Sequence, residues 1–228
     1  MGSLENLVLA APALLFAMIA HEYAHGYAAL RQGDPTAYQL GRLTWNPVKH
    51  IDPFMTIILP VLMALAHGPI LGGAKPVPVN PRNYRNYKRG DIIVSLAGVA
   101  TNLVIAVLSV PVVIALGAIA RAAPATMGVI AILQAMVIWG ILINLILVAF
   151  NLLPIPPLDG SHVMKYLLPP AWALQYQQIG RYGILILIGL LYVGGNVLWR
   201  WMSPAVGFFY FLVRLGADFI VPSRFLPF

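Results

Sequence analysis

Residues 21–25 read His-Glu-Tyr-Ala-His and lie inside an unbroken apolar run from Leu7 to Leu30. Ionisable side chains in an apolar helix of membrane-spanning length cost free energy, so a specific interaction has to compensate for that cost. Residues four apart share one face of a helix, and His21 and His25 can therefore bind the same metal ion. Glu22 lies about 60° around the helix from His25, close enough to act on a metal-bound water. The pattern predicts a zinc-dependent protease that works inside the membrane.

A histidine pair needs a third protein ligand if one position of the zinc is to stay open for water. Asp159 is the best candidate, in the sequence Asn-Leu-Leu-Pro-Ile-Pro-Pro-Leu-Asp-Gly over 151–160. The three prolines preclude a regular helix, and irregular backbone at membrane depth is tolerated only against protein or water, as around an active site. Gly160, which has no side chain, then permits the backbone next to Asp159 to approach its neighbours closely. The alternative is an interfacial loop in which Asp159 caps a helix over 160–168; the histidine pair favours the ligand.

The composition is that of an integral membrane protein. Of 228 residues, 60% are hydrophobic and 9% charged, with a mean hydropathy of +0.83, whereas soluble domains carry about 25% charged residues. No cysteine is present, so zinc must be held by histidine and carboxylate. The net charge of +7 does not predict nucleic-acid binding. Five basic residues lie in one loop, as the positive-inside rule expects of a cytoplasmic loop: Lys75, Arg82, Arg85, Lys88 and Arg89.

The apolar pattern predicts an all-α polytopic membrane protein with helices over 4–30, 91–120, 127–150 and 179–201. The run 54–67 contains Pro60 and is short for a full span. Both flanking loops are basic, which favours a re-entrant or β-like insertion after the first helix over a crossing. Residues 205–221 are a further candidate span. We therefore expect five or six membrane segments.

The distribution of charge also predicts an orientation. Arg31, Arg42 and Lys49 follow the first helix, so its carboxyl end is expected in the cytoplasm and the amino terminus outside. His21 lies about 14 Å from the helix end at Leu30, at ~1.5 Å per residue. The metal is therefore expected toward the cytoplasmic side, short of the midplane, with a polar channel supplying water. The expected location is the plasma membrane of a prokaryote.

Further motifs follow the first helix in order, at 33–37 (Gly-Asp-Pro-Thr-Ala), 41–53, 73–83, 97–102 and 151–160. Together with residues 21–25 they resemble the site-2 protease family of intramembrane zinc metalloproteases, in its short form without a PDZ or CBS domain. The resemblance runs to about residue 168, which divides the chain into a metalloprotease core over 1–168 and C-terminal membrane helices over 169–228. The family's Ala-Gly-Pro triplet reads Ala97-Gly98-Val99 here, a departure at a turn-like position.

The resemblance implies that His21, His25 and Asp159 bind one Zn²⁺ per chain and that Glu22 is the general base and acid. Zinc lowers the pKa of its water toward ~7, and Glu22 would take the proton and pass it to the leaving amine. The expected partner is a transmembrane-helix protein substrate in the lipid bilayer, which has to unwind locally. Residues 72–80 could pair with the unwound strand; the alternative is a sheet within the chain.

Most of the other polar residues have more than one interpretation. Asn102 and Asn151 either bind the substrate backbone or the developing oxyanion, or join helices, and the sequence does not decide. His50 either gates or lines the entrance, or donates to the transition state, or makes a hydrogen bond that stabilises its loop. His162 either supports the ligands from behind or is solvated at the start of a helix, which we favour. His67 is expected at the membrane interface.

A membrane transporter or ion pathway is the alternative function, because intramembrane His and Asp also mark ion pathways. It explains less of the sequence: Glu22 between two ligand-spaced histidines is catalytic geometry, and paired inverted halves are not visible. An inactive, chaperone-like relative is a third interpretation, but every expected catalytic residue is present. We therefore predict a zinc metalloendopeptidase that hydrolyses peptide bonds of membrane-spanning substrates through a zinc-activated water.

Overall fold

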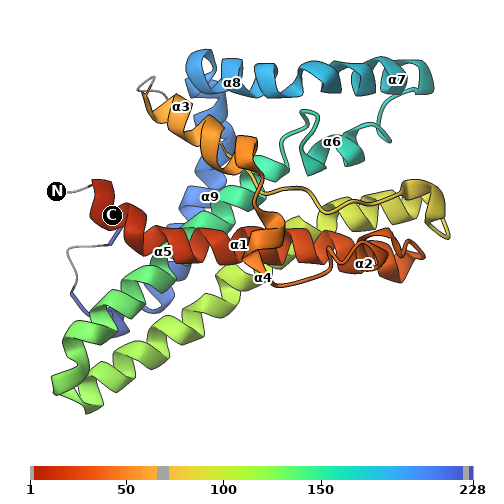
Figure 1. Ribbon diagram of the computed structural model, residues 1–228. Helices are drawn as coiled ribbons and strands as arrows, with labels where there is room; N and C mark the ends of the chain where they lie inside the picture. The colour runs from red at the N-terminus through yellow and green to blue at the C-terminus, as the bar shows by residue number, and fades with distance from the viewer. Residues whose placement is uncertain (1–2, 66–71, 223–225, 228) are drawn as a thin grey trace. The chain divides into compact units, whose positions relative to one another are not determined.

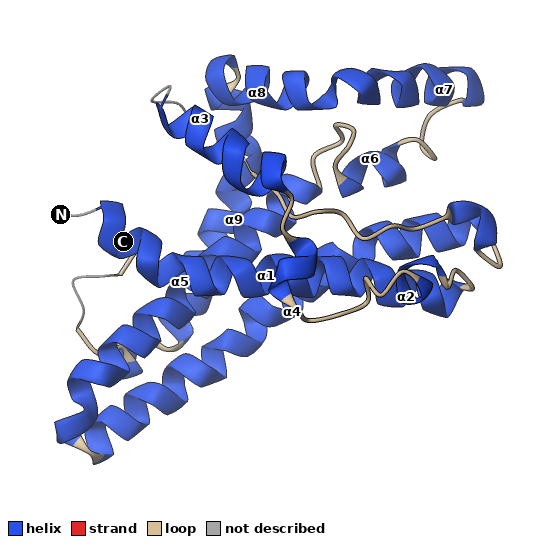
Figure 2. Ribbon diagram, in the orientation of Figure 1, coloured by secondary structure: helices blue, strands red, loops and turns tan. Residues whose placement is uncertain are grey.

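The computed structural model describes residues 3–65, 72–222 and 226–227. Every regular element in that part of the chain is a helix, which confirms the predicted all-α class (Figure 2). The long helices are α1 (Ser3–Gln32), α4 (Tyr87–Ala122), α5 (Met127–Asn151) and α9 (Gly195–Leu215) (Figure 1). The shorter ones are α2 (Thr36–Gln39), α3 (Leu59–Leu65), α6 (Asp159–Met164), α7 (Pro170–Ile179) and α8 (Gly183–Val193).

Among the described residues, three helical stretches are long and apolar enough to cross a membrane: Val8–Gln32, Tyr87–Ala122 and Pro124–Asn151. They coincide with the first three predicted helices. A fourth span results if Pro170–Val193 and Gly195–Leu215, which are bent by 92° at their junction, are counted as one. The chain is thus a helical membrane protein with three or four candidate spans, and the predicted five or six segments are not confirmed.

The single helix predicted over 179–201 is wrong. The chain bends between α8 and α9, at the pair Gly194 and Gly195. Glycine is a poor helix former and glycine-containing pairs are common sites of sharp helix kinks. A Cβ at Gly194 would lie 2.7 Å from the carbonyl oxygen of Leu190, so the bend requires glycine there. Because α9 starts at Gly195 and continues to residue 215, the bounds of the span predicted over 205–221 differ from those of the helix, and a separate span there is not confirmed.

The apolar run predicted over 54–67 begins as a π-helical segment, Pro53–Ile58, and continues as α3. The Asp52 carboxylate caps this segment by accepting from the backbone N–H groups of Phe54 and Met55. Residues 66 and 67, and with them the prediction for His67, lie outside the described residues. Re-entry stays a prediction. The β-like part is not confirmed, because residues 72–80 form no strand within the described chain.

Contacts divide the chain into two compact units, one of residues 1–17, 102–148 and 202–228 and the other of residues 18–101 and 149–201. The first unit has an apolar core from α4, α5 and α9, formed by Ala106, Val110, Val113, Ile138, Ile141, Leu145, Phe209 and Leu212. Gln134 is buried in the same unit. Its amide donates to the carbonyls of Val113 and Phe219 and accepts from the N–H of Val221, so this polar group is satisfied inside the protein, as membrane depth requires.

The second unit contains the ionisable residues of the predicted metal site. The loop after α1 is fixed there by Asp34, whose side chain is inaccessible to solvent. Its carboxylate accepts from Thr36, from the backbone N–H of Asn80 at 2.6 Å and from the Asn83 amide at 2.8 Å. Burial alone would raise the pKa of Asp34, but these hydrogen bonds lower the pKa below its usual value. The ionised carboxylate therefore joins the end of α1 to the segment that leads into α4.

Candidate metal centre

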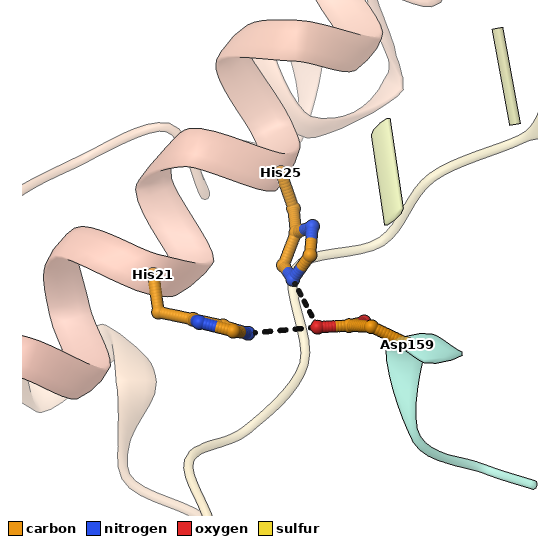
Figure 3. A group of neighbouring side chains, drawn as sticks. All are labelled: His21, His25 and Asp159. Atoms are coloured by element: carbon orange, nitrogen blue, oxygen red, sulfur yellow. Dashed lines mark hydrogen bonds and ion pairs between the residues drawn. The ribbon is translucent and has the colours of Figure 1, made fainter. Parts of the chain in front are cut away.

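His21 and His25 lie one turn apart on α1, and both rings point toward Asp159 at the start of α6 (Figure 3). Asp159 Oδ2 lies 3.1 Å from His21 Nε2 and 3.4 Å from His25 Nε2. One ligand atom from each residue lies within 4.8 Å of the other two. Two imidazoles and one carboxylate are a common ligand set for catalytic zinc. The group can therefore hold one metal ion.

Asp159 uses its side chain for this group and not for capping. Helix α6 begins at Asp159 itself, and no side-chain hydrogen bond caps it. Gly160 permits the close approach expected of it, since a Cβ there would lie 2.3 Å from the carbonyl oxygen of Leu152. Burial alone would raise the pKa of the Asp159 carboxyl, but the two imidazoles hold the pKa well below its usual range. Asp159 is therefore a carboxylate, the form that ligates metals.

A hydrogen bond from His25 to α4 sets which of its nitrogens faces the group. His25 Nδ1 lies 2.7 Å from the carbonyl oxygen of Val94. A carbonyl can only accept, so Nδ1 carries a proton, and Nε2 is the ring nitrogen that faces Asp159 and is available to a metal. Metal-ligating histidines almost always donate their second nitrogen in this way, which fixes the ring and raises its basicity. The orientation of His25 and the identity of the three donors thus fit zinc.

Gly98 on α4 leaves the space that an ion would need. A Cβ at this position would lie 2.6 Å from Nε2 of His21 and 2.6 Å from Nε2 of His25, closer than real contacts allow. The sequence predicted Gly98 only as part of a family motif and not as a neighbour of the ligands. The only local signal is a glycine within an otherwise apolar helical pattern, which usually has a packing or functional reason.

Glu22 contacts the segment that passes α1. Its Oε2 accepts the backbone N–H of Val77 at 2.7 Å. The segment is anchored on either side of this contact, because the N–H of Lys75 donates to the carbonyl of His50 at 2.7 Å and that of Asn80 donates to Asp34. The backbone of residues 75–80 is therefore held beside the histidine motif, with one of its N–H groups on the Glu22 carboxylate.

The remaining predicted residues lie in several places. His50 is buried and its Nε2 donates to the carbonyl of Thr44 at 2.9 Å, the hydrogen bond of the loop-stabilising interpretation. His162 Nδ1 lies 3.4 Å from a carboxylate oxygen of Asp91, and its side chain is partly exposed. Asn151 is the last residue of α5. Asn102 is buried in the first unit, and neither atom of its amide has a hydrogen-bond partner among the described residues. The functional roles of both asparagines stay predictions.

Comparison with known proteins agrees with this chemistry. The family model described as peptidase family M50 matches residues 9–191. The chain is 37% identical over 192 residues to the Bacillus subtilis protein named "Putative zinc metalloprotease YwhC", which covers 83% of this chain and 84% of that protein. It is 33% identical over 202 residues to "Putative zinc metalloprotease Rip2" of Mycolicibacterium smegmatis, covering 86% of this chain and 70% of the relative. No solved structure gives a significant match. Histidine motif, apolar helices and relatives together show that the chain belongs to peptidase family M50, the site-2 proteases, and is a membrane-associated zinc metalloprotease.

Proposed function

We propose that the chain hydrolyses peptide bonds of membrane-spanning proteins, with one zinc ion held by His21, His25 and Asp159. The observation that carries this proposal is the convergence of Asp159, from α6, with His21 and His25. The two histidines flank Glu22 on a helix long and apolar enough to cross a membrane. Zinc bound there would polarise the scissile carbonyl and lower the pKa of a water molecule.

Glu22 is the proton carrier in this proposal. Its carboxylate takes a proton from the attacking water and delivers it to the leaving amine. The hydrogen bond from the N–H of Val77 engages Oε2 and leaves Oε1 to accept the proton. A carboxylate held at one oxygen keeps its orientation through the reaction, so the same contact that restrains Glu22 supports its role as base and acid.

We further propose that residues 72–80 bind the substrate. A transmembrane helix resists hydrolysis because its carbonyls are hydrogen-bonded within the helix, so the scissile region has to unwind and needs new backbone partners. An extended peptide obtains them by adding to an exposed strand-like edge. Support comes from the position of this segment, which contacts Glu22 through Val77 and forms no strand pairing within the described chain. Its anchors at Lys75 and Asn80 would hold the edge in place.

Reconstitution of the purified chain in lipid vesicles tests the function and the metal together. We expect about one zinc per chain and cleavage of a membrane-spanning peptide, with both lost on chelation and restored by zinc. Asp159→Ala should deplete zinc, because two imidazoles alone leave the ion short of a ligand, whereas the control Asp218→Ala on the exposed 217–219 turn should not. Elemental analysis and mass spectrometry of the products give the two readouts.

Two results would contradict parts of this proposal. Full zinc occupancy in Asp159→Ala would remove Asp159 from the ligands. Zinc-dependent proton or cation flux across the vesicle membrane, without any cleavage, would contradict the protease function and favour the transporter.

We also propose an orientation, with the amino terminus outside, the 72–90 loop in the cytoplasm and the active site toward the cytoplasmic side of a prokaryotic plasma membrane. Five positive charges lie over residues 72–90, in the loop and the first turn of α4, against Arg121 alone in the last turn of α4, and this difference supports the orientation. The chain has no cysteine, so single cysteines can be introduced without background. A membrane-impermeant thiol reagent should label Arg121→Cys on intact cells and spare Arg85→Cys. The opposite labelling would reverse the topology.

A further inference from the structure

A buried carboxylate near the start of α4 joins this helix to α6. Asp91 is 2% exposed. Its Oδ2 accepts from the Tyr166 hydroxyl at 2.9 Å and pairs with the Lys165 ammonium, and its Oδ1 lies 3.4 Å from His162 Nδ1. All three partners follow Asp159, on α6 or on the turn directly after it. Asp91 therefore contacts the carboxyl-terminal end of the short helix whose first residue is the carboxylate of the metal centre.

The same face of α4 also contacts the two histidines. Asp91, Val94 and Gly98 are three and four residues apart and lie on one side of the helix. The carbonyl of Val94 accepts from His25, and Gly98 lies against the Nε2 atoms of both histidines. One stripe of α4 thus contacts the histidines of α1 and, one turn further toward its amino terminus, holds α6 through Asp91.

Helix α6 cannot hold its position by its own backbone. It has six residues and follows the proline-rich loop over 154–157, and isolated helices this short are unstable. Its position relative to the histidines has to come from contacts with other elements. His162 lies only about 4.5 Å further along the helix than Asp159, at ~1.5 Å per residue. Any rotation or shift of α6 that breaks the Asp91 contacts would therefore move the Asp159 carboxylate.

A buried ion pair is suited to this task. Lys165 and Asp91 are both largely removed from solvent, with side chains 11% and 3% exposed. Such pairs are weak evidence for stability, and their best-attested use is to specify the register of one element against another. The phenol of Tyr166 and the imidazole of His162 also orient α6 relative to Asp91, because each contacts a different carboxylate oxygen of Asp91.

We propose that Asp91 is a positioning residue that fixes α6, so that the Asp159 carboxylate meets the Nε2 atoms of His21 and His25. The inference rests on the proposed function, in which these three side chains bind zinc. Asp91 acts on the metal only through Asp159. Residues that orient metal ligands in this way typically contribute about 10–100-fold to metal affinity.

Zinc affinity of the purified full-length chain in detergent, measured by competition with a chelator, tests this role without relying on activity. Asp91→Ala should bind zinc about tenfold or more weakly. The matched control is Asp34→Ala, because Asp34 is the other fully buried, multiply hydrogen-bonded carboxylate of the same unit and its partners lie on the loops after α1 and before α4. That control should lower the melting temperature and leave zinc affinity unchanged. Tyr166→Phe, which removes one hydrogen bond of Asp91 and keeps the ring, should weaken zinc binding less than Asp91→Ala.

The outcomes separate the inference from the function on which it rests. Wild-type zinc affinity in a folded Asp91→Ala variant overturns the positioning role and does not affect the proposed protease function. Equal losses of zinc affinity in Asp91→Ala and Asp34→Ala also overturn the positioning role, because both variants would then act through the general stability of the protein. If Asp91→Ala does not fold, Tyr166→Phe decides, and unchanged zinc binding in that variant overturns the proposal. A wild-type chain that binds no zinc overturns the proposed function and this inference with it.

Discussion

Glu22→Gln is expected to reduce peptide hydrolysis by about three orders of magnitude, within the ~10²–10⁴-fold that general acid–base catalysis contributes. The amide keeps the size of the side chain and can still accept the N–H of Val77 through its carbonyl oxygen. It cannot take a proton from water. The variant should therefore fold and hold zinc like the wild type while cleavage of a membrane-spanning peptide, followed by mass spectrometry, is almost lost.

The chain supplies its own control for this variant. Glu5 is the only other glutamate and lies in the first turn of the same helix α1. Glu5→Gln makes the same chemical change there and should leave the cleavage rate within a factor of about two, as surface substitutions away from a site usually do. Near-normal cleavage by Glu22→Gln would refute the general-base assignment, and with it most of the proposed mechanism. Loss of zinc from Glu22→Gln would instead place Glu22 among the groups that hold the metal.

The residues that could be predicted from the sequence are those whose chemistry is local. His21 and His25 were predicted together because the helical period alone places them on one face, and the structure has them one turn apart with both rings toward Asp159. Asp159 was predicted because proline interrupts the apolar pattern just before it, so the backbone had to be irregular there. Neither argument needs knowledge of which helices are neighbours.

The residues that sequence reasoning missed lie on α4, and the reason is physical. Helix α4 is apolar around most of its circumference, so periodicity does not indicate which side faces another helix. Only the packing against α1 and α6 shows that Asp91, Val94 and Gly98 form the contacting stripe. A weak signal existed at Asp91, since a carboxylate near the end of an apolar helix calls for a buried partner.

Hydropathy also predicted the wrong helix bounds at the bend between α8 and α9. The run that includes α8 and the start of α9 is apolar on both sides of Gly194, so a window of hydropathy reads one continuous helix. The bend of 92° depends on backbone geometry at the glycine pair and not on the polarity of the neighbouring side chains. Length and composition therefore located the first three candidate spans and misjudged the helices that follow them.

Gly98→Ala is expected to abolish zinc binding and cleavage although it adds only one methyl group. The new Cβ would lie 2.6 Å from each of the two histidine Nε2 atoms, in the space between the ligands. Close packing lets neither ring retreat cheaply, because His25 is held by the carbonyl of Val94 and His21 is buried. Alanine is a better helix former than glycine by about 1 kcal/mol, so α4 itself should not be weakened. Elemental analysis and a thermal unfolding curve of the same sample separate these two effects.

Gly128→Ala is the matched control for this substitution. Gly128 is the second residue of another long apolar helix, α5, and a Cβ added there meets none of the described atoms within 4 Å. It adds the same methyl group without approaching the ligands, and should keep about one zinc per chain. Full zinc occupancy in Gly98→Ala, with cleavage intact, would mean that the ion does not lie between His21 and His25 on the side facing α4. Zinc lost from Gly98→Ala and kept in Gly128→Ala would place the ion against that face.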